Sequence, residues 1–210
     1  NGIKTFSITP SYSYNSKNSY LNPTAGKSIF ASVQAAGSVL GANVNTIRPT
    51  FDMQYYHASP KFRRATIAMH LMASFITGYG GKVAPPFSRT FIGGENDVRG
   101  FDFYSITPYA FIPSSANVGL LNPDLTPRTQ KVLVNGQLTS VNATLGIPTY
   151  QVISPGGDTQ SVFNFEYRMP IFGPVQVTPF FDAGMNRILL TNQLKVNPGQ
   201  ILNLNAQFPQ

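Results

Sequence analysis

The stretch TIRPTFDMQYYHA at residues 46–58 decides the fold, because two kinds of side chain alternate along it. One set is apolar or aromatic and consists of Ile47, Pro49, Phe51, Met53 and Tyr55. The residues between them are mostly polar and consist of Arg48, Thr50, Asp52, Gln54 and Tyr56. A period of two is typical of a β-strand whose two faces meet different surroundings. Both charges lie in the second set, so we expect that face to contact water.

The same alternation recurs along the chain. Besides 46–58, we expect strands at 6–15, 27–35, 64–79, 160–171 and 175–186. The segment AMHLMA at 68–73 is also compatible with a helix, but its tight link to the preceding strand favours a hairpin. Compact turns are expected at 18–26, 59–63 and 172–174, and longer connections at 36–45 and 80–159. A connection as long as the last is usually functional or disordered, and it contains a hairpin signal, Asn135-Gly136 after KVLV.

Composition favours a wall between lipid and water over a soluble globular protein. Charged residues make up 11% of the chain, where roughly 25% is usual. Hydrophobic residues reach only 42% and aromatic residues 12%, so small polar residues fill the difference. Bacterial outer-membrane barrels alternate lipid-facing with lumen-facing residues, and short turns with longer loops. The sequence therefore predicts an all-β fold, an antiparallel transmembrane β-barrel. About six strands are an incomplete section, because such a barrel needs at least about eight.

The inventory of side chains argues against catalysis. The chain has no cysteine, which excludes thiolate catalysis and Cys-ligated zinc. His57 and His70 are the only histidines, too few and too separated for a convincing metal site. Neither a Gly-x-Ser-x-Gly elbow nor a Walker loop is present. We expect no enzyme activity, no cofactor and no metal.

Charge and hydropathy limit the other classes of protein. The net charge is +7, but the 15 basic residues are spread thinly. The one cluster, KFRR at 61–64, is interpreted as a solvated turn, and no nucleic-acid partner is expected. No stretch approaches the roughly 20 apolar residues of a membrane helix. The first residues, NGIK, lack a signal-peptide pattern, so we expect a mature internal piece of an envelope protein.

Four segments carry a resemblance to a known family. They are YLNPTAG at 20–26, FIGGENDVRGF at 91–101, NFEYRMPI at 164–171 and PFFDAG at 179–184. In this order, and on the expected turn, loop and strands, they resemble the BamA family of outer-membrane insertases. The resemblance implies a barrel of about sixteen strands, of which residues 1–210 cover roughly the eighth to thirteenth. The family's POTRA repeats and its final strands are absent from this chain. The long connection, 80–159, then carries the VRGF segment and an insert at 109–158.

The resemblance also implies a site at Val98, Arg99, Gly100 and Phe101, on a loop that folds back into the barrel. Arg99 presents a planar fork of donors and stays charged, and Gly100 permits a sharp turn. Glu166 and Asp182 lie on the wet faces of neighbouring strands, where Arg99 could bridge both carboxylates. The resemblance supports this pairing over a solvated loop charge, and over an acid/base role for the carboxylates. The supporting residues are Gly93, Gly94, Arg168 and Gly184.

The function implied by the resemblance is the insertion and folding of other β-barrel proteins in the outer membrane of a Gram-negative bacterium. The implied partners are outer-membrane lipids including lipopolysaccharide, unfolded outer-membrane protein clients and periplasmic lipoprotein subunits. A two-partner-secretion pore of the same superfamily is the first alternative. A soluble β-sandwich that binds an acidic partner is the second.

Overall fold

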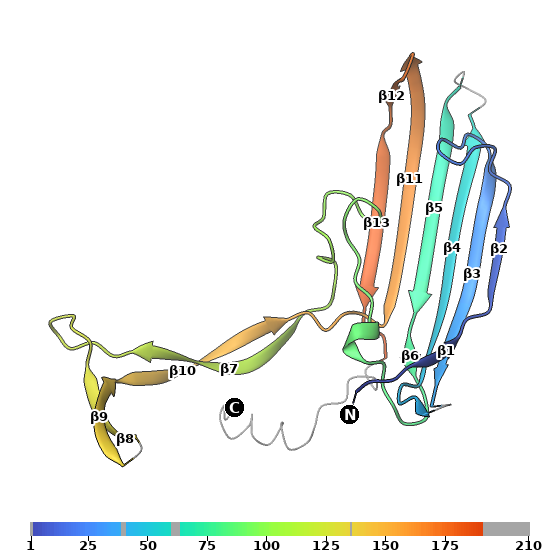
Figure 1. The fold of residues 1–210 in the computed structure, drawn as a ribbon. Coiled ribbons are helices and arrows are strands. Elements are labelled where there is room, and N and C mark those ends of the chain that lie inside the picture. Colours follow the sequence, from blue (N-terminus) through green and yellow to red (C-terminus); the bar gives the residue numbers. More distant parts are fainter. Residues whose placement is uncertain (1, 39–40, 60–63, 135, 191–210) are drawn as a thin grey trace. The chain divides into compact units, whose positions relative to one another are not determined.

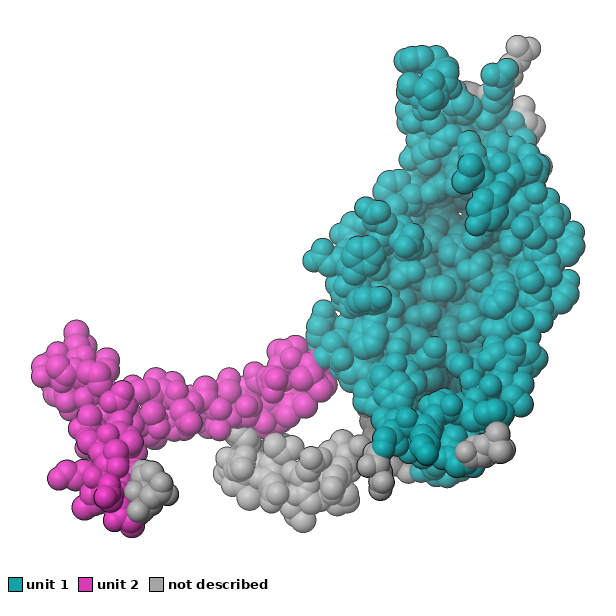
Figure 2. Space-filling model, in the orientation of Figure 1, with its two compact units in different colours: residues 1–109, 154–195 teal, residues 110–153, 196–210 magenta. Residues whose placement is uncertain are grey.

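A computed structural model describes residues 2–38, 41–59, 64–134 and 136–190. The chain divides into two compact units, 1–109 with 154–195 and 110–153 with 196–210 (Figure 2). Three features of the sequence lie outside the described residues: positions 61–63 of the basic cluster, Asn135 of the expected hairpin turn, and most of the polar tail.

The first unit is one antiparallel sheet (Figure 1). Its path runs β1-β3-β4-β5-β11-β12, with β2 beside β3, β6 beside β4 and β13 beside β11. The bounds are β1 Phe6–Ile8, β2 Ser11–Asn15, β3 Gly26–Gly37, β4 Thr46–Ala58, β5 Thr66–Phe75, β6 Thr77–Gly78, β11 Thr159–Phe172, β12 Val175–Val177 and β13 Phe180–Arg187. All six expected strands are present, and the prediction of an all-β antiparallel fold is confirmed.

Three expected strands have interruptions. Segment 6–15 splits into β1 and β2 around Thr9 and Pro10, since proline has no N–H to donate to a sheet. The Pro10 carbonyl still accepts from the Val33 amide at 3.1 Å, so the two pieces follow the same neighbour. Segment 175–186 divides into β12 and β13 in the same way, around Thr178 and Pro179. Segment 64–79 divides into β5 and β6 at Ile76, whose amide donates to the carbonyl of Asp158.

The helical alternative for 68–73 is wrong. These residues lie inside β5, and β5 pairs along its length with β4 on one side and β11 on the other. Across-sheet pairing outweighs the local helical preference, because it satisfies the backbone and buries the side chains at the same time. Residues Pro86–Ser88 form a 3-10 turn, and no helix among the described residues is long and apolar enough to span a bilayer.

The register of the sheet separates its side chains into two faces. Gln54, His70, Asn164 and Asp182 stand directly opposite one another on β4, β5, β11 and β13. The neighbouring row on the same face contains Tyr56, Ala68, Glu166 and Phe180. The opposite face exposes large apolar side chains, Val33, Ile47, Phe51, Tyr55, Leu71 and Phe181. The sheet thus has one polar and one apolar face, as the alternation predicts.

The connection between β6 and β11 holds more regular structure than the sequence indicates. The hairpin of β8 Thr129–Val134 and β9 Gln137–Asn142 is the one that the Asn-Gly signal predicts. A second pair, β7 Ala110–Gly119 with β10 Thr144–Ile153, was not expected from the sequence pattern. Each of these two strands contains a proline, Pro113 and Pro148, which weakens the strand signal. We call residues 110–153 the arm; it makes up the described part of the second unit.

Candidate functional site

Two glycines shape the segment that returns to the sheet. Gly93 and Gly94 have φ of +125° and +100°, in the left-handed region where other residues are strained. A Cβ on Gly94 would lie 2.5 Å from the ring of Phe103, so a side chain there would displace the ring. The carbonyl of Gly94 accepts from the Asp97 amide at 3.2 Å, and Gly94 pairs with Val98 in a short β-bridge. The resulting tight turn presents Val98 and Arg99 to the sheet.

Val98 is the apolar contact of this turn with the polar face of the sheet. The residue is 3% exposed, and it packs with Ile92 of the same connection and with Val162 of β11. Gly184 on β13 makes room for it, because a Cβ at Gly184 would overlap the Val98 Cγ2 and lie 3.0 Å from the Ile92 Cδ1. Met72 and Ile106 pack against the same cluster. A small dry patch therefore sits on an otherwise polar face.

Arg99 makes a bidentate pair with Asp182 and a single contact with Glu166. Its Nε and Nη2 donate to the two Asp182 carboxylate oxygens at 2.7 Å each, and its Nη1 donates to the Glu166 Oε1 at 2.7 Å. Its backbone N–H also donates to the Asp182 Oδ2 at 3.1 Å. The Asp182 side chain is only 3% exposed, against 28% for Arg99 and 19% for Glu166. We call Arg99, Glu166 and Asp182 the loop anchor.

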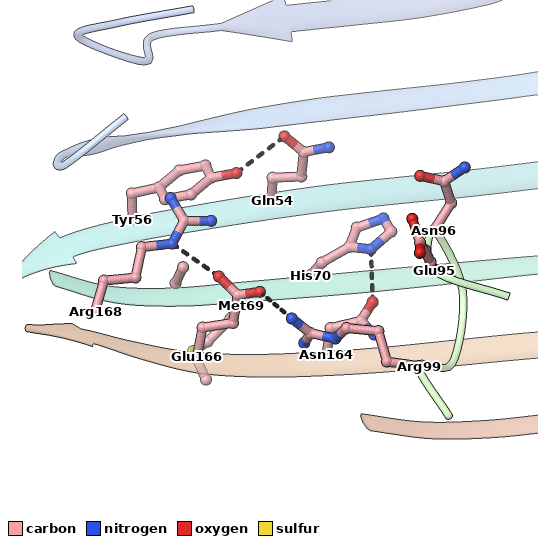
Figure 3. A pocket seen from close by; sticks show the side chains of 11 residues that line it. Gln54, Tyr56, Met69, His70, Glu95, Asn96, Arg99, Asn164, Glu166 and Arg168 are labelled. Atoms are coloured by element: carbon pink, nitrogen blue, oxygen red, sulfur yellow. Dashed lines mark hydrogen bonds and ion pairs between the residues drawn. The ribbon is translucent and has the colours of Figure 1, made fainter. Parts of the chain in front are cut away.

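The loop anchor is extended by neighbours on the same face. Arg168 donates from Nε to the second oxygen of Glu166 at 2.7 Å, and its guanidinium lies 5.5 Å from the ring centre of Tyr56 (Figure 3). The Arg99 guanidinium stacks 3.9 Å from the ring centre of Phe180. Two arginines thus face two carboxylates, and aromatic rings hold both guanidinium groups in place.

The charge of Arg99 is secure. Its hydrogen bonds to Asp182 and its single hydrogen bond to Glu166 raise the pKa of the Arg99 guanidinium above its ordinary value, against the opposing effect of burial. The ion pair is therefore present at any pH that leaves its carboxylate partners ionised. Because the bidentate geometry fixes the guanidinium plane, the anchor sets the orientation of the loop as well as its position.

The other two residues of the motif do not contact the sheet in the same way. Gly100 has φ of +84°, and a Cβ there would have no other atom within 4 Å, so its need for glycine is conformational. Phe101 is 55% exposed. The structure thus brings Val98 and Arg99 to the sheet together with Glu166, Asp182, Arg168 and Gly184, while Gly100 supplies a turn and Phe101 stays at the surface.

Sequence reasoning missed several residues of the site. Asn164 donates from Nδ2 to the Asp97 carbonyl at 2.7 Å and to the Asp182 Oδ1 at 2.9 Å, so it joins the loop to the anchor. Phe180 stacks on Arg99, and Ile92 with Ile106 completes the apolar cluster. The alternation already placed Asn164 on the face of Glu166, but only the register shows that it stands opposite Asp182.

A cavity of about 220 Å³ adjoins the loop anchor. Its lining is mainly polar, from β4, β5, β11 and the long connection (Figure 3). Within the part of the chain that the structure describes, no group of three or more His, Cys, Asp or Glu side chains could hold a metal ion. The arrangement is suited to holding a loop against a wet wall through hydrogen bonds and charge.

Comparison with known proteins assigns the fold to a family. The family model described as the Omp85 superfamily domain matches residues 3–200. The chain belongs to the Omp85 superfamily. The crystal structure of BamA from Haemophilus ducreyi lacking POTRA domains 1–3 matches 98% of this chain with a TM-score of 0.61 and 18% sequence identity. The match covers 32% of the BamA chain, so this Omp85 chain spans about a third of that structure's length.

The comparisons confirm the prediction of fold class. The antiparallel sheet of this Omp85 chain matches part of the β-barrel of that BamA structure. The resemblance to the BamA family is likewise confirmed at the level of the superfamily and of the fold.

Proposed function

We propose that this chain is a wall section of an outer-membrane insertase, and that its loop anchor holds the long connection inside the barrel during the insertion of client proteins. The observation that carries the proposal is the contact of Arg99 with Asp182 and Glu166 through three side-chain hydrogen bonds of 2.7 Å. A solvated loop arginine would not need two carboxylates on adjacent strands, one of them almost fully buried.

The energetics of the anchor support a positioning role. A carboxylate buried to the extent of Asp182 is costly unless it is paired, and the pair is worth keeping only with good geometry. Here geometry is bidentate, and Asn164 and the Arg99 amide donate two further hydrogen bonds to the same carboxylate. Release of the loop would leave the Asp182 and Glu166 carboxylates without the Arg99 guanidinium that neutralises them. The anchored state of the loop is therefore strongly favoured over intermediate positions.

The two faces of the sheet suit the proposed partners. The apolar face, with Phe51, Tyr55 and Leu71 exposed, is suited to outer-membrane lipids including lipopolysaccharide. Unfolded outer-membrane proteins would be the clients, and a weak seam elsewhere in the barrel would template their first strands by β-augmentation. Periplasmic lipoprotein subunits would act on the complete protein. In this scheme the described strands form wall and anchor, and the chain performs no enzymatic reaction.

Replacement of Arg99 by alanine in the full-length protein tests the proposal. We expect poor assembly of outer-membrane β-barrels, read as loss of heat-modifiable migration on gels. We also expect faster cleavage after Glu95 by a glutamate-specific protease, because Glu95 lies on the same turn as Arg99. The matched control is Arg128→Ala, since Arg128 is an exposed arginine on the arm.

Two results would count against the proposal. Normal barrel assembly with unchanged protection at Glu95 would remove the positioning role. Normal barrel assembly together with loss of export of one secreted polypeptide would favour the secretion pore of the same superfamily instead. Extraction of the protein without detergent would favour a soluble binding module.

A further inference from the structure

His70 stands in the middle of the polar face and touches a hydrogen-bonding partner with each ring nitrogen. Its Nε2 lies 2.8 Å from the Asp52 Oδ2 on β4, and its Nδ1 lies 2.9 Å from the Asn164 Oδ1 on β11. Figure 3 shows His70 beside Asn164, on the same face as Arg99 and Glu166. Neither His70 nor Asp52 takes part in the loop anchor, so their role is not explained by the arginine contact.

The orientation of the Asn164 amide is fixed by its other partners. Its Nδ2 faces the Asp97 carbonyl at 2.7 Å and the Asp182 Oδ1 at 2.9 Å. Both partners can only accept when Asp182 is ionised, so the NH₂ group of Asn164 must point toward them. The carbonyl oxygen of Asn164 then points at the Nδ1 of His70, and that nitrogen must carry a hydrogen to donate.

The other ring nitrogen faces an acceptor as well. An ionised carboxylate accepts hydrogen bonds and donates none, so one further proton must lie between the Nε2 of His70 and the Oδ2 of Asp52. A neutral histidine has one N–H and one bare nitrogen. In a neutral ring beside an ionised Asp52, the bare nitrogen would therefore face an oxygen lone pair, either of Asp52 or of Asn164.

Loss of this proton has two outcomes, and one of them reaches the long connection. If the bare nitrogen faces Asp52, the ring and the carboxylate repel each other. If it faces Asn164, the amide must reverse to donate to it, and the hydrogen bonds to Asp97 and Asp182 are lost. We propose that His70 is a proton-dependent positioning residue, which holds the long connection on the polar face through Asn164 while it is protonated. This inference rests on the proposed role of the loop anchor.

Other charged groups surround His70. Asp52 comes from β4, Glu166 and Arg168 from β11, Asp182 from β13, and Glu95, Asp97 and Arg99 from the long connection. Carboxylates and arginines seldom change charge between pH 6 and pH 8.5, whereas histidine is the residue that does. A change in loop protection across this range therefore reports on His70. The sign is fixed by the geometry, so protection should fall as the pH rises.

Limited trypsin digestion of the full-length protein in detergent or vesicles tests the proposal. The bond after Arg99 lies in the anchored turn, and the bond after the exposed Arg128 serves as an internal reference. The ratio of the two cleavage rates cancels the pH dependence of trypsin and follows the open population of the loop. Between pH 6.0 and pH 8.5 we expect this ratio to rise by about tenfold, the effect of one hydrogen bond to a charged group.

Two variants separate protonation from structural support. His70→Gln cannot donate to both Asp52 and Asn164, so its ratio should be high at both pH values. Asp52→Asn can donate to the bare nitrogen of a neutral ring, so its ratio should stay low at both pH values. The matched control is His57→Gln, because His57 is an exposed histidine stacked on Tyr55 and away from the loop. That variant should keep the wild-type profile.

The proposal is overturned if the wild-type ratio does not change with pH, if His70→Gln keeps the wild-type pH dependence, or if Asp52→Asn loses protection at high pH. The readout is loop protection and requires no assembly activity. If Arg99→Ala does not impair barrel assembly, the proposed function is refuted, but the pH dependence of loop protection is unaffected. If loop protection does not depend on pH, the role of His70 is refuted, but the assembly assay of Arg99→Ala is unaffected.

Discussion

The coupling between Arg99 and Asp182 can be measured with a double-mutant cycle of Arg99→Gln, Asp182→Asn and the combined variant. The structure indicates an interaction well above that of a surface ion pair, about 0–1 kcal/mol. The Asp182 side chain is 3% exposed and accepts two charge-assisted hydrogen bonds of 2.7 Å from Arg99. Breaking a buried pair costs about 3–5 kcal/mol. Because Arg99 is still 28% exposed, we expect coupling near the lower end, about 3 kcal/mol or roughly a 150-fold change in loop opening.

The assay is amide hydrogen exchange at Ile106 in the full-length protein. This amide donates to the carbonyl of Ile92 at 3.0 Å, within the part of the connection that packs on the sheet. Its protection therefore reports the free energy of loop opening. Each single variant should lose protection strongly, while the double variant should lose little more than either. Loss that adds up within about 0.5 kcal/mol would show that the two residues act independently and would refute the anchor. Arg128→Gln should leave Ile106 unchanged.

Two further predictions concern the fit of the loop and the independence of the arm. Gly184→Ala should weaken Ile106 protection by about 1–3 kcal/mol, the usual cost of overpacking. Adding Val98→Ala, which removes the overlapping Cγ2, should restore part of it, and no change in Gly184→Ala would contradict the contact. Replacing residues 110–153 by two glycines should leave Ile106 protection within about 0.5 kcal/mol of wild type. The pairing of Thr90 with Gly157 and the hydrogen bond from Ser154 to Thr107 close the connection without the arm. Loss of protection in this deletion would show that the arm supports the loop anchor.

Much of the fold was predictable, because alternation is a local property. From Ile47 to Tyr55 each second residue is apolar or aromatic, and a strand with one polar and one apolar face has no other way to arrange its side chains. The expected strands 27–35, 46–58 and 160–171 accordingly match β3, β4 and β11 closely. The pair of β7 and β10 was not predictable in the same way. Its partners are separated by the whole β8–β9 hairpin, and neither strand has a clean alternation.

The candidate site was predictable only in part. Arg99, Glu166 and Asp182 stood out through the resemblance and through their placement on polar faces. Asn164 and His70 did not stand out, because a neutral amide and a lone histidine on a strand carry no signal of their own. Their importance comes from hydrogen-bond direction, and direction requires the positions of all partners at once.

By itself the sequence determined where the strands run and which of their residues share the polar face, since these depend on neighbours within a few positions. The return of the long connection to the sheet was implied only by the family resemblance. The tertiary structure decided what those residues do together. The register of β4, β5, β11 and β13 sets Gln54, His70, Asn164 and Asp182 in one row, and a slip of one residue in a strand would move its polar residue to the apolar face. Only this register gives Arg99 its two carboxylates and gives His70 two acceptors, because charge and hydrogen bonding act over a few ångströms and not along the chain.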